Sequence, residues 1–271
     1  MILVTGATGL SGSIVMRELA RQDVAARALV RTPSKASLLG ALPRAEIVIG
    51  DMSKPDTLGT ALAGIKRVLM ISSADHRMVE TQCTFIDACL QAGVQHVIKF
   101  SGAEPDFDPQ KFLFTRMHEE IERYLERSGL GWTHLRPSQF MQVYLREAPS
   151  ITADNAFRLP LADIQLAPID LLDVARIATA LLRDGGHEGR SFDMTGPEAL
   201  TMSDIADRLS QATGRTIRYV AIPLEERHKM LLAQGIPSYF VDALDDQTRE
   251  RLKRKETRTC LEAHRASGSN R

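Results

Sequence analysis

Short apolar runs alternate with helical patterns along the first half of this chain, and that alternation limits the fold more than any other feature. The runs MILVTG, ARALV, AEIVIG, RVLMIS, HVIKFSG and GWTHLRP predict strands. Helices are expected between them at residues 11–22, 33–41, 55–63, 76–92 and 109–128. Because the strands are almost continuously apolar, both faces of the sheet should be buried. We therefore predict an α/β fold, a Rossmann-type doubly wound parallel sheet.

The rhythm changes after about residue 150. Pro160 and Pro168 interrupt a stretch of loop and short strand, and a helix near 170–183 and the strand RSFDMTG follow. The segment TMSDIADRLSQATG predicts a helix with Thr201 as its N-cap and Gly214 just past its end. The strand IRYVAI and a helical tail from Pro223 complete the chain, and the last residues, ASGSNR, are expected to be unstructured.

The composition excludes several classes of function. Lys plus Arg and Asp plus Glu both number 34, so no overall field draws the chain to nucleic acid or to an anionic membrane. The basic run TRERLKRKETR, 248–258, is more typical of a solvated helix. The cysteines Cys83, Cys89 and Cys260 show no disulfide or zinc spacing, which favours a reducing, cytoplasmic location without a metal. MILVTGATG has no basic leader region, and no apolar stretch is long enough to span a membrane.

The motif TGATGLSG follows the first strand directly and opens the first helix. In that context, glycines three apart permit a tight turn, a close approach to a pyrophosphate and close packing of helix on strand. The alternative is a turn whose glycines serve only steric needs. The predicted dinucleotide contacts from this motif are Gly6, Thr8, Gly9, Leu10, Ser11 and Gly12.

A basic pair follows the second strand, where an enzyme selecting NAD would present an acidic residue to the ribose. The sequence there is LVRTPSKAS, with Arg31 and Lys35 accompanied by hydroxyl side chains. Two cations suit a 2′-phosphate, so we predict NADP(H), with NADPH preferred over NADH. The alternative is that both are ordinary solvated charges. Asp51, after the third strand, is expected to face the adenine, although it could equally cap its own loop, and Met52 is a further predicted cofactor contact.

Several segments together resemble the NmrA-like branch of the atypical short-chain dehydrogenases: VTGATGLSG, LVRTPSKAS, GDMSKPDTL, GVQHVIKFSG, HEEIERYLERSGLGWTHLRPSQFMQ and PIDLLDVA. The similarity runs from Met1 to about Gly235. Members of this branch include triphenylmethane-dye reductases, quinone reductases, an azoreductase and non-catalytic redox sensors. The resemblance implies a Rossmann core with an NADP-type cofactor and does not choose between enzyme and sensor.

The resemblance gives a meaning to the stretch KFLFTRMHEEIERYL. In the wider superfamily a Tyr proton donor and a Lys lie four residues apart on this helix; here Phe114 and His118 occupy those positions. Without the Tyr, ketone reduction would lose its general acid, whereas acceptors with stable hydride adducts would not need one. His118 could hold the ribose or supply a proton, because its reference pKa is near neutrality. Alternatively, Phe114 is core, His118 is half exposed and Glu122 is solvated.

Other candidate residues follow the later strands, where ligands collect in such sheets. Ser72, Ser73 and Pro137 are expected beside the cofactor, and Ser101 is a possible polar contact to the substrate or ribose. Phe140 and Met141 would offer an apolar wall to a flat acceptor, or would simply pack in the core.

Three functions are compatible with these residues to different degrees. The leading prediction is an NADPH-dependent reductase of a small aromatic acceptor, working as a monomer or homodimer. The second is an NADP(H)-binding sensor that acts through a protein partner. A nucleotide-sugar epimerase or dehydratase is disfavoured because Phe114 cannot replace the Tyr that those reactions use. The chain divides into a nucleotide-binding core at 1–149, to which a strand and helix at about 164–195 return, and a substrate-covering part at 150–271.

Overall fold

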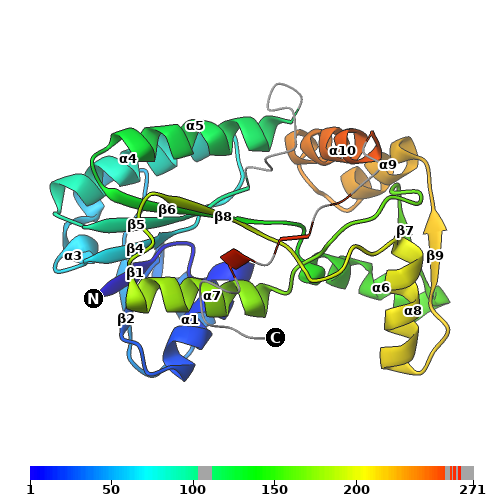
Figure 1. Cartoon of the computed structure of the whole chain (residues 1–271), viewed down its shortest axis with the longest axis horizontal. Helices are drawn as coiled ribbons and strands as arrows, with labels where there is room; N and C mark the ends of the chain where they lie inside the picture. Colours follow the sequence, from blue (N-terminus) through cyan, green and yellow to red (C-terminus); the bar gives the residue numbers. More distant parts are fainter. Residues whose placement is uncertain (103–111, 254–256, 258, 261, 264–271) are drawn as a thin grey trace.

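Seven parallel strands form the main sheet (Figure 1). In sheet order they are β3 (Ala45–Ile49), β2 (Ala26–Val30), β1 (Ile2–Val4), β4 (Arg67–Met70), β5 (His96–Phe100), β6 (Gly131–Pro137) and β8 (Arg190–Met194). The strand order reverses between β1 and β4, and the carboxyl ends of the strands at such a point form the usual ligand crevice of open α/β sheets. The predicted Rossmann-type fold is confirmed.

The computed structural model describes residues 1–102, 112–253, 257, 259–260 and 262–263. Residues 109–111 of the helix expected at 109–128, part of the basic run at 248–258 and the tail ASGSNR lie outside the described residues. Cys83, Cys89 and Cys260 are free thiols.

Helices cover both faces of the sheet (Figure 1). One face carries α1 (Leu10–Arg21) and α7 (Leu171–Asp184), which contact each other. The other carries α3 (Gly59–Leu62), α4 (Met78–Gln91) and α5 (Leu113–Arg127). The two layers enclose separate apolar cores, one on each side of the sheet.

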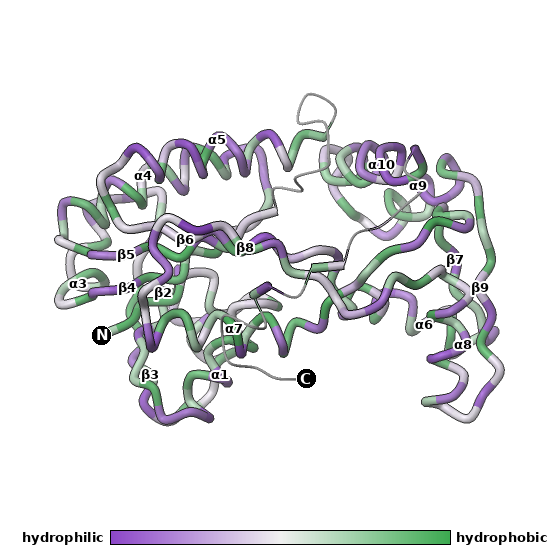
Figure 2. Tube along the Cα trace, in the orientation of Figure 1, coloured by the Kyte–Doolittle hydropathy of each residue, from purple (hydrophilic) through white to green (hydrophobic). Residues whose placement is uncertain are grey.

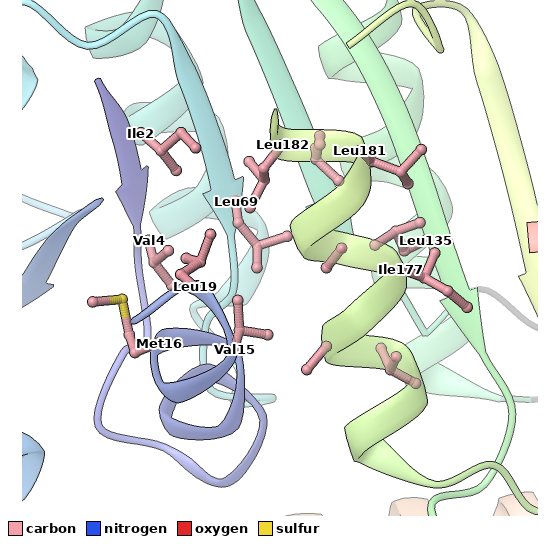
Figure 3. Packing of buried hydrophobic residues seen from close by; sticks show 14 of the residues in the cluster. Ile2, Val4, Val15, Met16, Leu19, Leu69, Leu135, Ile177, Leu181 and Leu182 are labelled. Atoms are coloured by element: carbon pink, nitrogen blue, oxygen red, sulfur yellow. The ribbon is translucent and has the colours of Figure 1, made fainter. Parts of the chain in front are cut away.

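The core under α1 and α7 follows from the helical spacing of their apolar residues. Val15, Met16 and Leu19 of α1 and Ile177, Leu181 and Leu182 of α7 point at Val4, Leu69 and Leu135 of the sheet (Figure 3). Burying each such side chain contributes about 1.5–3 kcal/mol. Asp170 caps α7 by accepting a hydrogen bond from the Leu172 amide at 2.8 Å, so the helix starts at a fixed place over the sheet.

Helix α5 is amphipathic, as the alternating bands in Figure 2 show. Phe114, Met117, Ile121 and Leu125 are buried against the sheet at helical spacing. Glu122 is also buried, with only 3% exposure, so the expectation that it could be a solvated residue is wrong. Its burial is possible because β6 supplies a charged partner, described below.

A second unit lies beyond one end of the sheet (Figure 1). It contains the parallel pair β7 (Ala156–Leu159) and β9 (Arg218–Ala221) and the helices α6 (Ala148–Asp154), α8 (Met202–Thr213), α9 (Leu224–Ala233) and α10 (Ser238–Leu252). Between residues 171 and 194 the chain returns to the main sheet as α7 and β8. Thr201 and Asp204 form the expected capping box of α8, and Gly214 ends it with a positive φ of 66°.

Three predicted helices are shorter or divided. The helix expected at 33–41 is α2 (Pro33–Ala36) followed by a 3-10 turn, and Gly40 stops it with a φ of 62°. The helix expected at 55–63 begins as a 3-10 turn, Pro55–Thr57, before α3. The tail after Pro223 is divided into α9 and α10 because Gly235 adopts a φ of 78° and Pro237 cannot continue a helix.

Candidate functional site

The glycine loop between β1 and α1 leaves no room for side chains at two of its positions. Gly6 has a φ of 59°, and a Cβ at Gly12 would lie 2.3 Å from the carbonyl oxygen of Gly6. Thr5 ties the loop to the end of β4, since its hydroxyl donates to the Ile71 carbonyl at 2.7 Å and accepts from the Ile71 amide at 2.8 Å. The backbone of the loop is therefore held close to the sheet edge.

The start of α1 is open towards that edge. Gly9 is the N-cap residue and contributes no capping side chain, and among the described residues no side chain caps the first-turn amides. Gly9 and Leu10 are exposed, while Thr8 and Ser11 are partly buried. A helix N-terminus of this kind binds anions through its backbone N–H groups and its dipole.

The ends of β2 and β3 carry the other polar candidates. Arg31 and Lys35 are both exposed, directly after β2 and in α2. The Asp51 carboxylate accepts hydrogen bonds from the amide of Ser53 at 2.9 Å and its hydroxyl at 2.8 Å. Burial alone would raise the pKa of Asp51, but these bonds and nearby cations lower it below its ordinary value. The side chain of Met52 packs into the core, with 8% exposure.

A cavity of about 420 Å³ lies at the carboxyl ends of β4, β5 and β6 and beneath the second unit. It brings together seven of the predicted site residues. These are Ser11, Ser72, Ser101, Phe114, His118, Pro137 and Phe140. Its volume is within the range of pockets that hold small organic ligands.

Two residues predicted at the carboxyl ends of the later strands, Ser73 and Met141, do not line this cavity. Met141 is 40% exposed in the 3-10 segment Met141–Glu147, so its side chain is not part of the wall. Ser73 is exposed beside Ser72, whose hydroxyl does line the cavity and accepts a hydrogen bond from Gln82 at 2.8 Å. Phe114 is 8% exposed at the cavity wall, where its ring contacts those of Phe112 and Phe240.

A chain of buried polar groups runs from β6 to the cavity. Arg136 donates two hydrogen bonds to the Glu122 carboxylate, at 3.0 and 2.6 Å, and Ser101 also bonds to Glu122. Lys99 donates to the Ser101 hydroxyl at 3.2 Å, and its Nζ lies 2.8 Å from Nδ1 of His118. The chain therefore ends on a side chain that lines the cavity.

The titration behaviour of this chain differs from what isolated side chains would show. Burial lowers the pKa of Lys99 to about 7, with Arg136 adding to the effect and Glu122 opposing it. Burial, followed by the charge of Lys99, lowers the pKa of His118 well below its ordinary value of 6.5. Burial would raise the pKa of Glu122, but the hydrogen bonds from Arg136 and other groups lower it. His118 is consequently a neutral imidazole near pH 7.

The second unit supplies the opposite wall of the cavity. Arg227 of α9 forms a buried ion pair with Glu147, at 2.6 Å. The Tyr144 hydroxyl accepts a hydrogen bond from Gln139 at 3.1 Å, and burial raises the pKa of Tyr144 to about 12. Arg251 of α10 donates to the side-chain oxygen of Gln139. These contacts hold α9 and α10 over the ends of β5 and β6.

Sequence reasoning missed Lys99, Tyr144 and the wall from α9 and α10. Lys99 was readable in part, because a lysine within the apolar run HVIKF must be buried if the strand is central and then needs a partner. The residues of α9 and α10 carried no comparable signal. Among the described residues, no cluster of three or more His, Cys, Asp or Glu side chains could bind a metal. Within the same part of the chain, no helix combines the length and apolar character needed to cross a membrane.

The fold and site define a Rossmann-type α/β protein with a ligand-sized cavity at the carboxyl ends of its strands. The model of the NmrA-like family matches residues 1–265, and the chain belongs to this family. The resemblance inferred from the sequence is thereby confirmed.

Three relatives illustrate the family around this chain. The NAD(P)H azoreductase of Xenophilus azovorans is 36% identical over 248 residues, which cover 91% of this chain and 85% of the azoreductase. The Escherichia coli NADPH-dependent quinone oxidoreductase, solved with NADPH, is 27% identical, with a TM-score of 0.86 over 99% of this chain and 95% of that one. The Citrobacter sp. triphenylmethane reductase, solved with NADP(H), shares the fold with a TM-score of 0.86 at 23% identity, covering 99% and 96% of the two chains.

Proposed function

We propose that this protein is an NADPH-dependent reductase that transfers a hydride to a flat aromatic acceptor without a tyrosine general acid. Quinones, triphenylmethane dyes and azo compounds are acceptors of this kind. The observation that carries the proposal is the cavity, which joins Ser11 of the glycine loop to the rings of Phe114 and Phe140. The names of the azoreductase and quinone oxidoreductase relatives support the same reaction class.

The chain's own residues fit a dinucleotide phosphate. The glycine loop and the open N-terminus of α1 would hold the pyrophosphate through the backbone of Gly6, Gly9, Leu10, Ser11 and Gly12. Glycine is needed at position 12 for this close packing, because a side chain there would collide with Gly6. When bound, NADPH supplies a hydride from its nicotinamide ring.

The end of β2 would decide between NADPH and NADH. Arg31 and Lys35 are exposed there and would grip the 2′-phosphate, and no acidic side chain occupies the residue directly after β2. Asp51 would face the adenine from the end of β3. Ser72, Ser73 and Pro137 would border the nicotinamide half, at the ends of β4 and β6.

The cavity walls suit an acceptor that needs little acid catalysis. Phe114 stands where a superfamily Tyr would donate a proton, and a phenyl ring has no proton to give. Hydride adducts of quinones, cationic dyes and azo compounds are stabilised by delocalisation or by loss of charge. Phe114 and Phe140 would flank the acceptor, and placing it against the nicotinamide would supply most of the rate. Ser101 would connect Lys99 to Glu122, because its hydroxyl is hydrogen-bonded to both side chains.

The test is NADPH oxidation by the purified protein in the presence of a naphthoquinone, a triphenylmethane dye, an azo dye and a simple ketone. Rapid loss of the reduced-nicotinamide absorbance with one of the first three, and none with the ketone, is the expected result. The ketone is the matched control, because its reduction depends on the Tyr general acid that Phe114 replaces here.

Tight NADPH binding without oxidation by any acceptor would overturn the reductase proposal. That outcome would move the function to the alternative, an NADP(H)-binding redox sensor that acts through a protein partner. The cytoplasmic location, the monomeric or homodimeric state, the lack of a nucleic-acid partner and the division at residue 150 stay predictions.

A further inference from the structure

Lys99 is a lysine without solvent exposure in the centre of the main sheet. Its exposed fraction is 0%, and its register partners are Met70 on β4 and His134 on β6. A buried amine is costly unless its N–H groups find acceptors. Lys99 has two, the hydroxyl of Ser101 and Nδ1 of His118, so its position is set by the polar chain.

The hydrogen bonds of that chain have one consistent direction. Glu122 is ionised beside Arg136, and an ionised carboxylate only accepts hydrogen bonds. Ser101 must therefore donate to Glu122, which leaves its oxygen to accept from Lys99. A further N–H of Lys99 then donates to Nδ1 of His118.

This direction fixes the tautomer of His118. A neutral imidazole whose Nδ1 accepts a hydrogen bond carries its proton on Nε2. His118 lines the cavity, and its Nε2 makes no hydrogen bond to any described residue. Gly102 borders the same edge of the ring, where a Cβ would lie 2.8 Å from both Nε2 and Cδ2. The open position at Gly102 therefore allows the ring to present Nε2–H at the cavity.

We propose that Lys99 is a positioning residue that holds His118 as the Nε2–H tautomer and supplies the proton that His118 passes to the reduced acceptor. This inference rests on the proposed reductase function and adds a proton path to it. It assigns no contact between Lys99 and the substrate, because the imidazole lies between them.

The proton path balances as follows. Bound NADPH would supply the hydride and be oxidised by two electrons, and the acceptor would gain that hydride and leave an oxygen or nitrogen atom anionic. That atom takes the proton from Nε2 of His118, while Nδ1 takes a proton from the Lys99 ammonium and leaves a neutral amine. After the product leaves, a water-borne proton returns to Nε2 and the Nδ1 proton returns to Nζ.

The surroundings of Lys99 make it suited to this exchange. Burial lowers its pKa to about 7, so both the ammonium and the amine are accessible near neutral pH. Burial raises the pKa of the neighbouring Cys83 to about 11, so that thiol stays protonated. Within the described part of the chain, the charged and titratable groups that face Lys99 or His118 are Cys83 of α4, Glu122 of α5, and His134 and Arg136 of β6.

The first experiment reads the tautomer of His118 by nitrogen-15 NMR of histidine-labelled protein without cofactor, with His118→Gln used for assignment. Below about pH 7, where Lys99 is an ammonium that can only donate, the wild-type ring is expected as the Nε2–H tautomer, and Lys99→Met is expected to lose this preference. A wild-type ring protonated on Nδ1 would overturn the proposal without any variant. The same tautomer and the same titration in Lys99→Met would also overturn it.

The second experiment measures turnover with an azo acceptor and NADPH. In Lys99→Met we expect kcat to fall, by less than the roughly hundredfold loss of a required general acid because the acceptor needs little acid catalysis, with KM little changed. The fall in kcat as pH rises through about 7 in the wild type should disappear in this variant. Lys66→Met is the matched control, since Lys66 is exposed at the other end of the sheet.

The two experiments separate this inference from the proposed function. If none of the acceptors causes the wild type to oxidise NADPH, the reductase proposal is refuted, whatever the NMR shows. The solvent isotope effect on kcat is measured in the same assay. If the wild type turns over and Lys99→Met keeps the wild-type kcat, pH profile and solvent isotope effect, the proton path alone is refuted. Loss of the solvent isotope effect in Tyr144→Phe instead of Lys99→Met would assign the proton to the cavity's phenol and also refute it.

Discussion

Replacing Lys99 by methionine should change how the stability of the protein depends on pH. Burial lowers the pKa of Lys99 from 10.5 to about 7 in the folded chain, whereas the unfolded chain keeps the ordinary value. Between these two pH values the unfolded chain binds more protons at this site than the folded chain. The free energy of unfolding of the wild type should therefore rise with pH across this window.

The size of the effect follows from the two pKa values. A difference of this size corresponds to about 5 kcal/mol in total at about 1.4 kcal/mol per pKa unit. Between pH 7 and pH 9 the change amounts to about 2 kcal/mol. This window lies above the ordinary pKa of 6.5 for histidine, so titration of His118, whose pKa is lowered further, adds little to it. Methionine has no proton to lose, so the variant lacks this contribution.

Urea unfolding at pH 7, 8 and 9 measures the effect, with the wild type, Lys99→Met and the exposed-lysine control Lys66→Met compared at each pH. From pH 7 to pH 9 the wild type should gain about 2 kcal/mol relative to Lys99→Met and nothing relative to Lys66→Met. The lost hydrogen bonds to Ser101 and His118 shift the whole curve without changing its slope. If the free energies of unfolding of the wild type and Lys99→Met differ by the same amount at all three pH values, the claim that Lys99 loses its proton near pH 7 is refuted.

Three further changes test other parts of the structure. Arg31→Asp should weaken NADPH binding by about tenfold or more with little effect on NADH binding, as measured by fluorescence titration. Equal losses for both cofactors, or the same loss in the control Arg44→Asp at the amino end of β3, would refute the 2′-phosphate assignment. Gly102→Ala should displace His118, lowering stability by about 1–3 kcal/mol and kcat with it, and an unchanged kcat would show that the ring position is not needed. Thr201→Ala should cost about 1 kcal/mol in urea unfolding by removing the cap of α8 and leave kcat unchanged; a loss of less than about 0.3 kcal/mol would show that the cap contributes little there.

The elements that sequence reasoning placed correctly are those with local causes. Most strands of the main sheet are short apolar runs, and their parallel arrangement follows from the alternation of strands and helices along the chain. The capping box of Thr201 and Asp204 and the positive φ of Gly214 are properties of a few neighbouring residues. The strand-loop-helix context of the glycine motif is local in the same way.

The elements that were missed depend on contacts between distant segments. The expected helix at 33–41 is cut short by Gly40, whose effect within a helical pattern depends on where the chain must turn back to β3. The cavity wall from α9 and α10 is set by pairs such as Arg227 with Glu147, which are 80 residues apart. Charge and helical period do not reveal such a pairing, because any exposed helix would show the same pattern.

The identity of the acid in the candidate site could not be predicted from the sequence either, because it also depends on contacts in the fold. Sequence reasoning singled out His118 because the reference pKa of histidine is near neutrality. In the fold, burial and Lys99 lower the pKa of His118 well below that value, while burial lowers the pKa of Lys99 to about 7. The group that changes charge near neutral pH is thus the lysine of β5, and the histidine is its neutral contact with the cavity. A residue's reference pKa identifies an acid only where the fold leaves that residue in water, whereas Lys99 is fully buried and His118 is only partly exposed.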